Sequence, residues 1–276
     1  MNNVSLSLNE LRDISKRARM HIIEMVYGAK SGHPGGSLSI IDVLTVLYFK
    51  EMRVDPANPN DPERDMFVLS KGHASPALYS ILSLRGYFPE DLLSGFRKIS
   101  SKLEGHVHYG VPGVEASTGS LGQGLGVGVG MALASKLDNR HNRVYVVIGD
   151  GEIEEGSIWE SFMAGYKYRL NNLIVILDRN MIQLDGFTED IMPMIEIKSK
   201  VESFGWNVLE IDGHNHNEII SAIEKAKESE GYPTLIIART IKGKGVSYME
   251  NNPKYHGSPP ESEDLYQRAL KEIREN

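Results

Sequence analysis

The sequence predicts an α/β fold, a doubly wound and mostly parallel β-sheet with helices on both faces. Short apolar runs with the length of buried strands alternate along the chain with longer segments of helical periodicity. This alternation indicates right-handed β–α–β crossovers and a parallel sheet of about five or more strands. With 276 residues, 41% of them hydrophobic and 24% charged, the chain can bury the core that such a fold requires.

The elements are expected in a definite order. A helix over residues 11–27 is followed by a Gly- and Pro-rich break at 31–36, a helix at 39–48 and a loop at 55–62. The predicted strands are residues 66–69, 144–148, 173–177, 206–211 and 235–238. The predicted helices between them are residues 77–84, 121–137, 158–168 and 218–227. Residues 1–276 are expected to form one domain, with residues 258–276 as a C-terminal appendage.

Composition excludes several classes of function. The chain has no cysteine, which rules out disulfides, thiolate catalysis and cysteine-ligated metal centres. Thirty basic and 37 acidic residues give a net charge of −7, which argues against a nucleic-acid partner. Residues 1–12 lack the apolar core of a signal peptide, and the apolar runs are too short to span a membrane. We therefore expect a cytoplasmic protein with no membrane partner.

The most informative motif is Gly149-Asp150-Gly151, which directly follows a predicted strand, while Asn180 follows the next one. Ligands of open parallel sheets gather at the carboxyl ends of strands, and these two side chains offer the hard oxygens that magnesium or calcium prefers. The glycines let the backbone approach a phosphate closely, and residues 152–156 open a helix whose amides could face anionic oxygens. Alone, the motif could be a simple turn, but Asn180 at the matching boundary favours a site.

Three histidines lie in glycine-flanked loops, His33, His73 and His106. A lone histidine is usually structural, but three of them beside a metal motif indicate a site that handles protons or sugar hydroxyls. The glycine-rich run 119–130 could cradle a phosphate or form a closely packed helix, and we expect both functions in succession. It matches neither a Walker loop nor a dinucleotide fingerprint.

Together these motifs resemble the transketolase family, over about residues 10–260. The matching segments are Ser31-Gly32-His33-Pro34-Gly35-Gly36, Lys71-Gly72-His73-Ala74-Ser75-Pro76, Leu103-Glu104-Gly105-His106, Thr118-Gly119-Ser120-Leu121-Gly122-Gln123-Gly124, Gly149-Asp150-Gly151-Glu152-Ile153-Glu154-Glu155-Gly156 and Leu177-Asp178-Arg179-Asn180-Met181-Ile182. In the third segment Val107 stands where the family commonly has proline.

The resemblance implies that the chain binds thiamine diphosphate and Mg²⁺, with Ca²⁺ or Mn²⁺ as substitutes. The implied metal ligands are the side chains of Asp150 and Asn180 and the backbone carbonyl of Ile182. The residues implied to contact the cofactor are His73, Gly119, Ser120, Leu121, Asp150, Gly151, Glu152, Asn180, Ile182, Lys242 and His256.

The resemblance also implies catalytic roles. His33, His106 and His256 would contact substrate hydroxyls and move protons during transfer of a two-carbon ketol unit between sugar phosphates. Glu155 would belong to an acidic network that links paired cofactor sites. It could equally be an acid that is favourable at a helix N-terminus.

The family's activating glutamate and pyrimidine-ring pocket belong to a second, pyrimidine-binding domain, for which this sequence has no segment. We therefore expect that domain on a partner, the C-terminal transketolase subunit, in an α2β2 heterotetramer. Pentose-phosphate metabolism is the default setting. The alternatives are a subunit of another thiamine-dependent enzyme, such as the first component of an oxoacid dehydrogenase, or deoxyxylulose-phosphate synthase. A module that binds the cofactor or a sugar phosphate without turnover is the non-enzymatic alternative.

Overall fold

The computed structural model describes residues 6–275. Residues 1–5 and 276 lie outside the described residues, and so do the beginning of the polar segment 1–12 and the two ends of the predicted domain.

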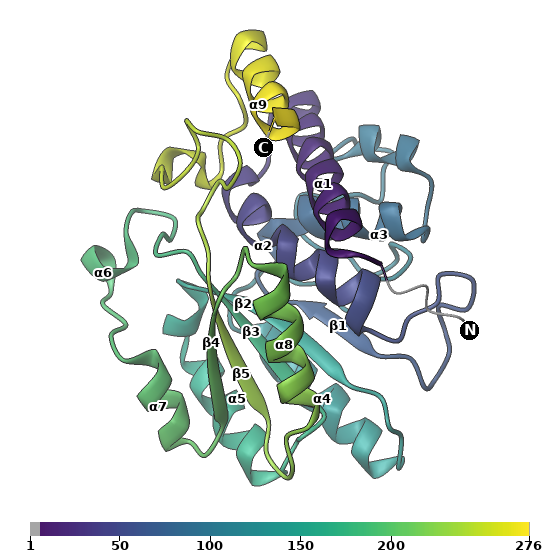
Figure 1. The fold of residues 1–276 in the computed structure, drawn as a ribbon, viewed down its shortest axis with the longest axis vertical. Coiled ribbons are helices and arrows are strands. Elements are labelled where there is room, and N and C mark those ends of the chain that lie inside the picture. The colour runs from purple at the N-terminus through teal and green to yellow at the C-terminus, as the bar shows by residue number, and fades with distance from the viewer. Residues whose placement is uncertain (1–5, 276) are drawn as a thin grey trace.

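A five-stranded sheet forms the centre of the molecule (Figure 1). Its strands are β1 (Met66–Leu69), β2 (Val144–Gly149), β3 (Leu173–Arg179), β4 (Asn207–Asp212) and β5 (Thr234–Arg239). They lie in the order β1-β2-β3-β5-β4, and every neighbouring pair is parallel. The predicted parallel α/β sheet is therefore confirmed.

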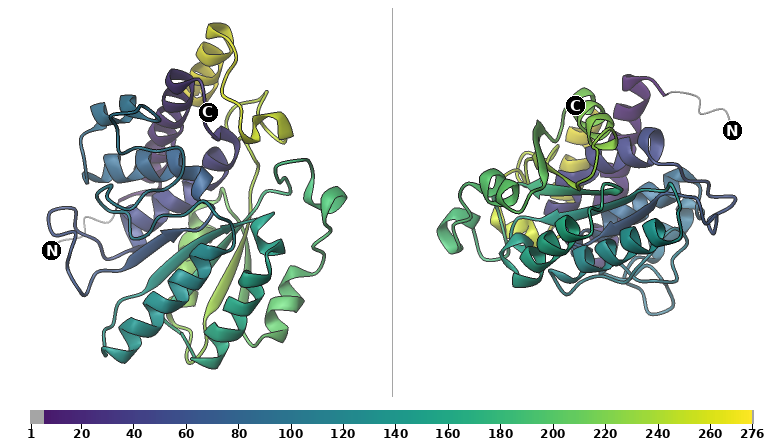
Figure 2. Two further views of the ribbon diagram at one scale, coloured as in Figure 1. Left: turned by 180° about the vertical axis from the view of Figure 1, so that it is seen from behind. Right: turned by 90° about the horizontal axis from the view of Figure 1, so that it is seen from below.

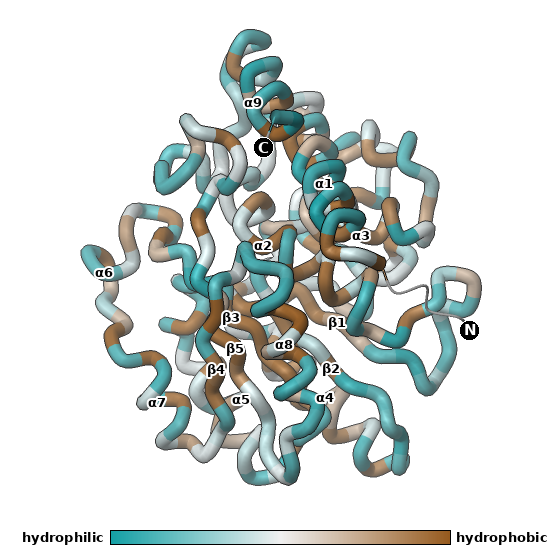
Figure 3. The backbone as a smooth tube through the Cα atoms, viewed as in Figure 1, coloured by the Kyte–Doolittle hydropathy of each residue, from teal (hydrophilic) through white to brown (hydrophobic). Residues whose placement is uncertain are grey.

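Helices cover both faces of this sheet (Figure 2). One face carries α1 (Leu8–Ala29), α2 (Pro34–Val46), α3 (Ser75–Arg85), α8 (His216–Lys227) and α9 (Glu263–Glu275). The other carries α4 (Gln123–Leu137), α5 (Gly156–Lys167) and α7 (Ile197–Ser203). Alternate residues of one strand enter opposite cores, so that Tyr145 and Val147 pack on the first face and Val144 and Val146 on the second. The central strands are accordingly apolar along their length (Figure 3).

The two ends of the described chain pack against each other. α1 begins with a capping box, in which Ser7 and Glu10 satisfy each other's backbone amides. Tyr27 of α1 stacks on Tyr266 of α9 with ring centroids 4.2 Å apart. Residues 258–276, expected to be an appendage, include α9, whose buried Ala269, Leu270 and Ile273 belong to the larger core.

Some predicted boundaries are wrong. Residues 31–36 do not break regular structure throughout, because α2 already begins at Pro34, where proline fits the first helical turn. A glycine is needed at position 35 within α2, because a Cβ there would be 2.7 Å from the Tyr255 carbonyl oxygen. The predicted helix 121–137 begins two residues later, at Gln123. β4 is a half-exposed edge strand, and α6 (Thr188–Ile191) and α7 were not predicted, because short elements carry little periodic signal.

Candidate functional site

A cavity of about 510 Å³ lies at the carboxyl ends of the strands. The loops after β2, β3 and β5 contribute Asp150, Asn180 and Lys242, and the N-cap position of α2 contributes His33. All the residues predicted to form the site line this cavity except Ser120, which is exposed between two residues that do line it, Gly119 and Leu121. The structure thus brings together residues that are far apart in the sequence.

The predicted metal ligands lie on neighbouring strand ends, because β2 pairs directly with β3. The Asp150 carboxylate is 3% exposed and accepts hydrogen bonds from the Met181 amide and, at 2.9 Å, from Arg179 Nη1. Asn180 Oδ1 accepts from the Ile182 amide at 3.2 Å. The Ile182 carbonyl oxygen lines the same region and accepts from Lys242 Nζ at 2.7 Å.

This set of donors fits a small hard cation, since it combines a carboxylate, an amide oxygen and a backbone carbonyl. Between residues 6 and 275 no group of three or more His, Cys, Asp or Glu side chains could hold a metal ion. Arg179 occupies one oxygen of Asp150, so a cation at this place has to displace or share that contact.

Burial perturbs the charged groups of the site. Desolvation raises the pKa of Asp150 to about 6, although the adjacent Arg179 opposes the shift. Burial, together with the nearby Lys71 ammonium, lowers the pKa of Lys242 to about 7. A buried amine and a buried carboxylate in one cavity are typical of a site that binds a charged ligand.

Four histidines surround one side of the cavity. The ring centroid of His33 lies 5.4 Å from that of His73 and 5.6 Å from those of His106 and His256. Burial, and then the positive charges nearby, lowers the pKa of His33 to about 4 and that of His256 to about 3. His33 Nδ1 is buried without a hydrogen-bond partner in the described chain. A neutral imidazole with an unpaired nitrogen can form a hydrogen bond with a hydroxyl group of a ligand, either as donor or as acceptor.

Glu152 differs from the other predicted cofactor contacts, because its carboxylate is already fully engaged. It accepts from the Gly122 amide at 2.9 Å, from the Gly149 amide at 3.1 Å and from the Ser70 hydroxyl. Glu152 therefore ties the glycine-rich loop to Gly149 at the end of β2, the residue before Asp150. Glu155, by contrast, is exposed at the N-cap position of α5.

The sequence prediction missed the buried pair of Lys71 and Asp178. Lys71 Nζ donates to the Asp178 carboxylate and, at 2.8 Å, to the Gly36 carbonyl, and both side chains are almost fully buried. Burial opposes the ionisation of Asp178. The Lys71 ammonium and the hydroxyl groups of Ser39 and Thr240 nevertheless hold the pKa of Asp178 below its usual value. The available signal was a charged residue at the end of each of two apolar strands.

The fold and the site together define an α/β protein with a ligand-binding cavity, lined by the buried Lys71 and Lys242, at the carboxyl ends of a parallel sheet. A family model described as "Transketolase, thiamine diphosphate binding domain" matches residues 11–272. The chain belongs to this family, and its domain binds thiamine diphosphate.

Similar proteins include split transketolases. The chain is 46% identical over 243 residues to the 6-deoxy-6-sulfo-D-fructose transketolase subunit SqwG of Clostridium sp. (strain MSTE9), with 88% of each chain covered. It is 45% identical over 261 residues to one of the subunits of the apulose-4-phosphate transketolase of Phocaeicola vulgatus, with 95% of this chain and 92% of that protein covered.

A solved structure agrees with this assignment. The transketolase of Campylobacter jejuni superposes with a TM-score of 0.92 at 35% identity. The match covers 98% of this chain and 43% of that transketolase, so the chain spans less than half of the solved protein. No helix among residues 6–275 is long and apolar enough to cross a membrane.

Proposed function

We propose that this chain is the diphosphate-binding half of a split transketolase, active with a second subunit that carries the pyrimidine-binding domain. It would transfer a two-carbon ketol unit from a ketose phosphate to an aldose phosphate. The observation that carries the proposal is the convergence of Asp150, Asn180, Lys242 and the histidine cluster on one cavity at the strand ends. Bound thiamine diphosphate supplies the carbanion chemistry of such a transfer.

In this proposal Asp150, the Asn180 side chain and the Ile182 carbonyl hold Mg²⁺, for which Ca²⁺ or Mn²⁺ can substitute. Their oxygens lie at adjacent strand ends. The loop of Gly119, Ser120 and Leu121 with Gly151, His73 and Lys242 would contact the cofactor. The Lys242 ammonium is a suitable partner for its anionic end, because this side chain is buried in the cavity wall.

His33, His106 and His256 are proposed to hold substrate hydroxyls and to move protons. They are three imidazoles of one cluster, and their lowered pKa values keep them neutral near pH 7, a state in which each ring can both donate and accept a hydrogen bond to a substrate hydroxyl. Glu155, exposed beside the glycine-rich loop, would join an acidic network between paired cofactor sites. Glu152 positions the loops that it binds.

The need for a second subunit is supported by the rim of the cavity. Leu184 and Met192 line it but are 65% and 55% exposed, and Phe187, Ile191 and Ile195 in the same segment are 44%, 45% and 64% exposed. Apolar side chains exposed in this number beside a site are typical of a surface that another protein covers. We propose that the covering protein is the C-terminal transketolase subunit, in an α2β2 assembly located in the cytoplasm.

The relatives named for apulose 4-phosphate and for 6-deoxy-6-sulfo-D-fructose cover most of this chain's length. Their names favour a sugar that carries an anionic group as the substrate of this protein as well. Pentose-phosphate metabolism is the default setting for the reaction, and the histidine cluster suits sugar hydroxyls in either case.

The metal site is tested by titrating the protein with thiamine diphosphate in the presence and absence of Mg²⁺. Asp150→Ala should abolish the metal-dependent part of binding, raising the dissociation constant by more than about 100-fold, because it removes the only carboxylate among the donors. Asp138→Ala removes an exposed carboxylate remote from the cavity and should leave binding unchanged. Unchanged binding by Asp150→Ala would rule out the proposed metal site.

A further inference from the structure

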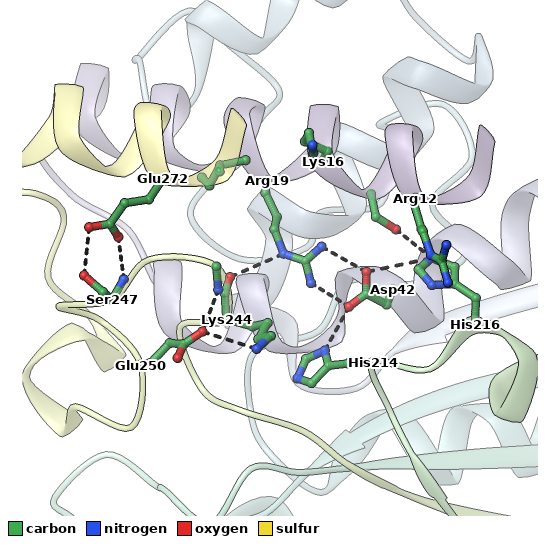
Figure 4. A pocket seen from close by; sticks show the side chains of 13 residues that line it. Arg12, Lys16, Arg19, Asp42, His214, His216, Lys244, Ser247, Glu250 and Glu272 are labelled. Carbon is green, nitrogen blue, oxygen red and sulfur yellow. Dashed lines mark hydrogen bonds and ion pairs between the residues drawn. The ribbon is translucent and has the colours of Figure 1, made fainter. Parts of the chain in front are cut away.

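A second cavity, of about 610 Å³, opens between α1, α9 and the loops that follow β4 and β5. It shares no lining residue with the cofactor cavity. Figure 4 shows Asp42 of α2 in its wall, between Arg19 and His214. These three side chains form a continuous polar chain that none of the site motifs accounts for.

Asp42 is held from two sides. Arg19 donates to both of its carboxylate oxygens, at 2.9 and 2.6 Å, and His214 Nδ1 lies 2.8 Å from Oδ2. The carboxylate side chain is 5% exposed. Burial alone would raise the pKa of Asp42, but the Arg19 guanidinium and His214 hold it below its usual value. An ionised Asp42 therefore orients the His214 ring.

The other nitrogen of His214 reaches the loop that carries Lys242. His214 Nε2 accepts a hydrogen bond from the backbone N–H of Ile241 at 2.9 Å. This geometry defines the tautomer, because Nδ1 faces a carboxylate and must donate while Nε2 faces an N–H and must accept. Ile241 directly precedes Lys242, whose ammonium lies against the Ile182 carbonyl and, at 2.8 Å, against His256 Nδ1.

We propose that Asp42 and His214 are positioning residues that fix the 241–242 backbone and so place the Lys242 ammonium at the cofactor site. The inference rests on the role proposed above for Lys242. Asp42 sets the tautomer of His214, His214 holds the Ile241 amide, and the amide fixes where the lysine leaves the backbone. The Gly243 amide, which donates to the Gly35 carbonyl at 3.0 Å, holds the other side of the lysine to α2.

His216 supplies a matched control. It lies two residues after His214, lines the same cavity, is also buried and lies 3.9 Å from Asp42 Oδ1, but its Nε2 is hydrogen-bonded to Ser15 of α1 at 3.1 Å, whereas the bond to the Ile241 amide belongs to His214. Replacing either histidine by phenylalanine keeps a ring of similar size and removes its polar atoms. A general loss of packing would affect both variants alike, whereas the positioning role belongs to His214 alone.

The first test is hydrogen–deuterium exchange of the full chain without ligand, read on a peptide that covers residues 240–246. His214→Phe should accelerate exchange in this peptide by roughly fivefold or more, because the Ile241 amide loses its acceptor. His216→Phe should leave it unchanged. His214→Gln, which keeps one donor and one acceptor, should restore protection. Equal exchange in wild type and His214→Phe overturns the inference.

The second test is a double-mutant cycle on the affinity of the assembled enzyme for thiamine diphosphate with Mg²⁺. We expect His214→Phe to raise the dissociation constant about tenfold in the wild type and by less than about twofold in a Lys242→Met background. An effect of equal size in both backgrounds means a purely structural histidine and overturns the inference. In a third outcome, His214→Phe accelerates hydrogen–deuterium exchange as expected while neither Lys242→Met nor His214→Phe changes the affinity for thiamine diphosphate. This result would contradict the role proposed for Lys242 and would still support the hydrogen bond by which His214 positions the loop.

Discussion

At the scale of single residues, the buried ion pair of Lys71 and Asp178 joins two of the site motifs. Lys71 lies two residues before His73, and Asp178 lies two residues before Asn180. Because both charges are almost fully buried, each depends on the other for compensation. The pair thus connects the folding free energy of the domain to the placement of a histidine and of a proposed metal ligand.

Asp178→Asn should lower the free energy of unfolding by about 3–5 kcal/mol, because it leaves the Lys71 ammonium buried without a counter-charge. Urea denaturation followed by circular dichroism measures this change. The exposed pair of Arg140 and Asp138, 2.8 Å apart, is the control, and Asp138→Asn should cost less than about 1 kcal/mol. Equal losses in the two variants would show that the buried pair has no special role.

His33 should make stability depend on pH. Its pKa in the folded protein is about 4, below the ordinary value of 6.5, so between these values the unfolded chain binds more protons than the folded chain. The contribution of His33 to stability is therefore complete above about pH 6.5 and is lost progressively as the pH falls toward 4. His33→Gln should reduce the decline of the unfolding free energy over this window.

The measurement is a series of urea denaturation curves between pH 4 and pH 8 for both proteins. When the unfolding free energy is plotted against pH, the plots for wild type and His33→Gln should run parallel above about pH 7, which serves as the internal control. Plots that remain parallel down to pH 4 would show that His33 titrates alike in the folded and unfolded states.

At the scale of elements, α4 shows why a helix contains so many glycines. A Cβ on Gly128 would lie 2.4 Å from Val146 Cγ2 of β2, whereas a Cβ on Gly130 would meet no atom within 4 Å. The first glycine lets the helix approach the sheet, and the second has no such packing reason in this chain. The expectation that Gly124, Gly126, Gly128 and Gly130 allow close packing therefore holds for Gly128, and also for Gly124, where a Cβ would lie 2.4 Å from Ser70 Oγ, but not for Gly130.

Two substitutions in α4 separate these effects. Gly128→Ala should destabilise the isolated chain by about 1–3 kcal/mol through overpacking against β2. Gly130→Ala should stabilise it by roughly 0.5–1 kcal/mol, because alanine loses less backbone entropy in a helix. Thermal denaturation of both variants gives the comparison. A loss of stability at Gly130 as large as that at Gly128 would contradict this account of the helix.

The elements also show how far sequence reasoning reaches. β2, β3 and β5 were predictable because strands buried on both faces are apolar along their length. The beginning of α2 was not predictable. Gly35 suggested a break in the chain, whereas a glycine is needed there because of a residue distant in the sequence, Tyr255, whose carbonyl oxygen lies close to it. Nor could local patterns reveal Arg179 beside Asp150, or the hydrogen bond of His214 to Ile241, since their partners come from separate elements.

At the scale of the whole molecule, the sheet places the loops that follow β2, β3 and β5 at the carboxyl ends of the strands, beside a cavity rim that is apolar and exposed. Strand-end geometry predicted that Asp150 and Asn180 lie close together, because the carboxyl ends of parallel strands meet at one end of the sheet, whereas residues such as Lys242 were expected only from the resemblance to the transketolase family. The exposed segment around Leu184 and Met192 was not predicted, since isolated apolar residues in a loop carry no periodic signal. The domain therefore presents the site and, beside it, the exposed apolar segment that is proposed above to be covered by a second protein chain.

The central claim is tested most directly by measuring ketol transfer, from a ketose phosphate to an aldose phosphate, by this chain alone and by the complex isolated with it from its native source. Mass spectrometry identifies the second chain. We predict no turnover by the isolated chain, and turnover dependent on thiamine diphosphate and Mg²⁺ once a partner with a pyrimidine-binding domain is present. Turnover by this chain alone, or isolation without any such partner, would contradict the account.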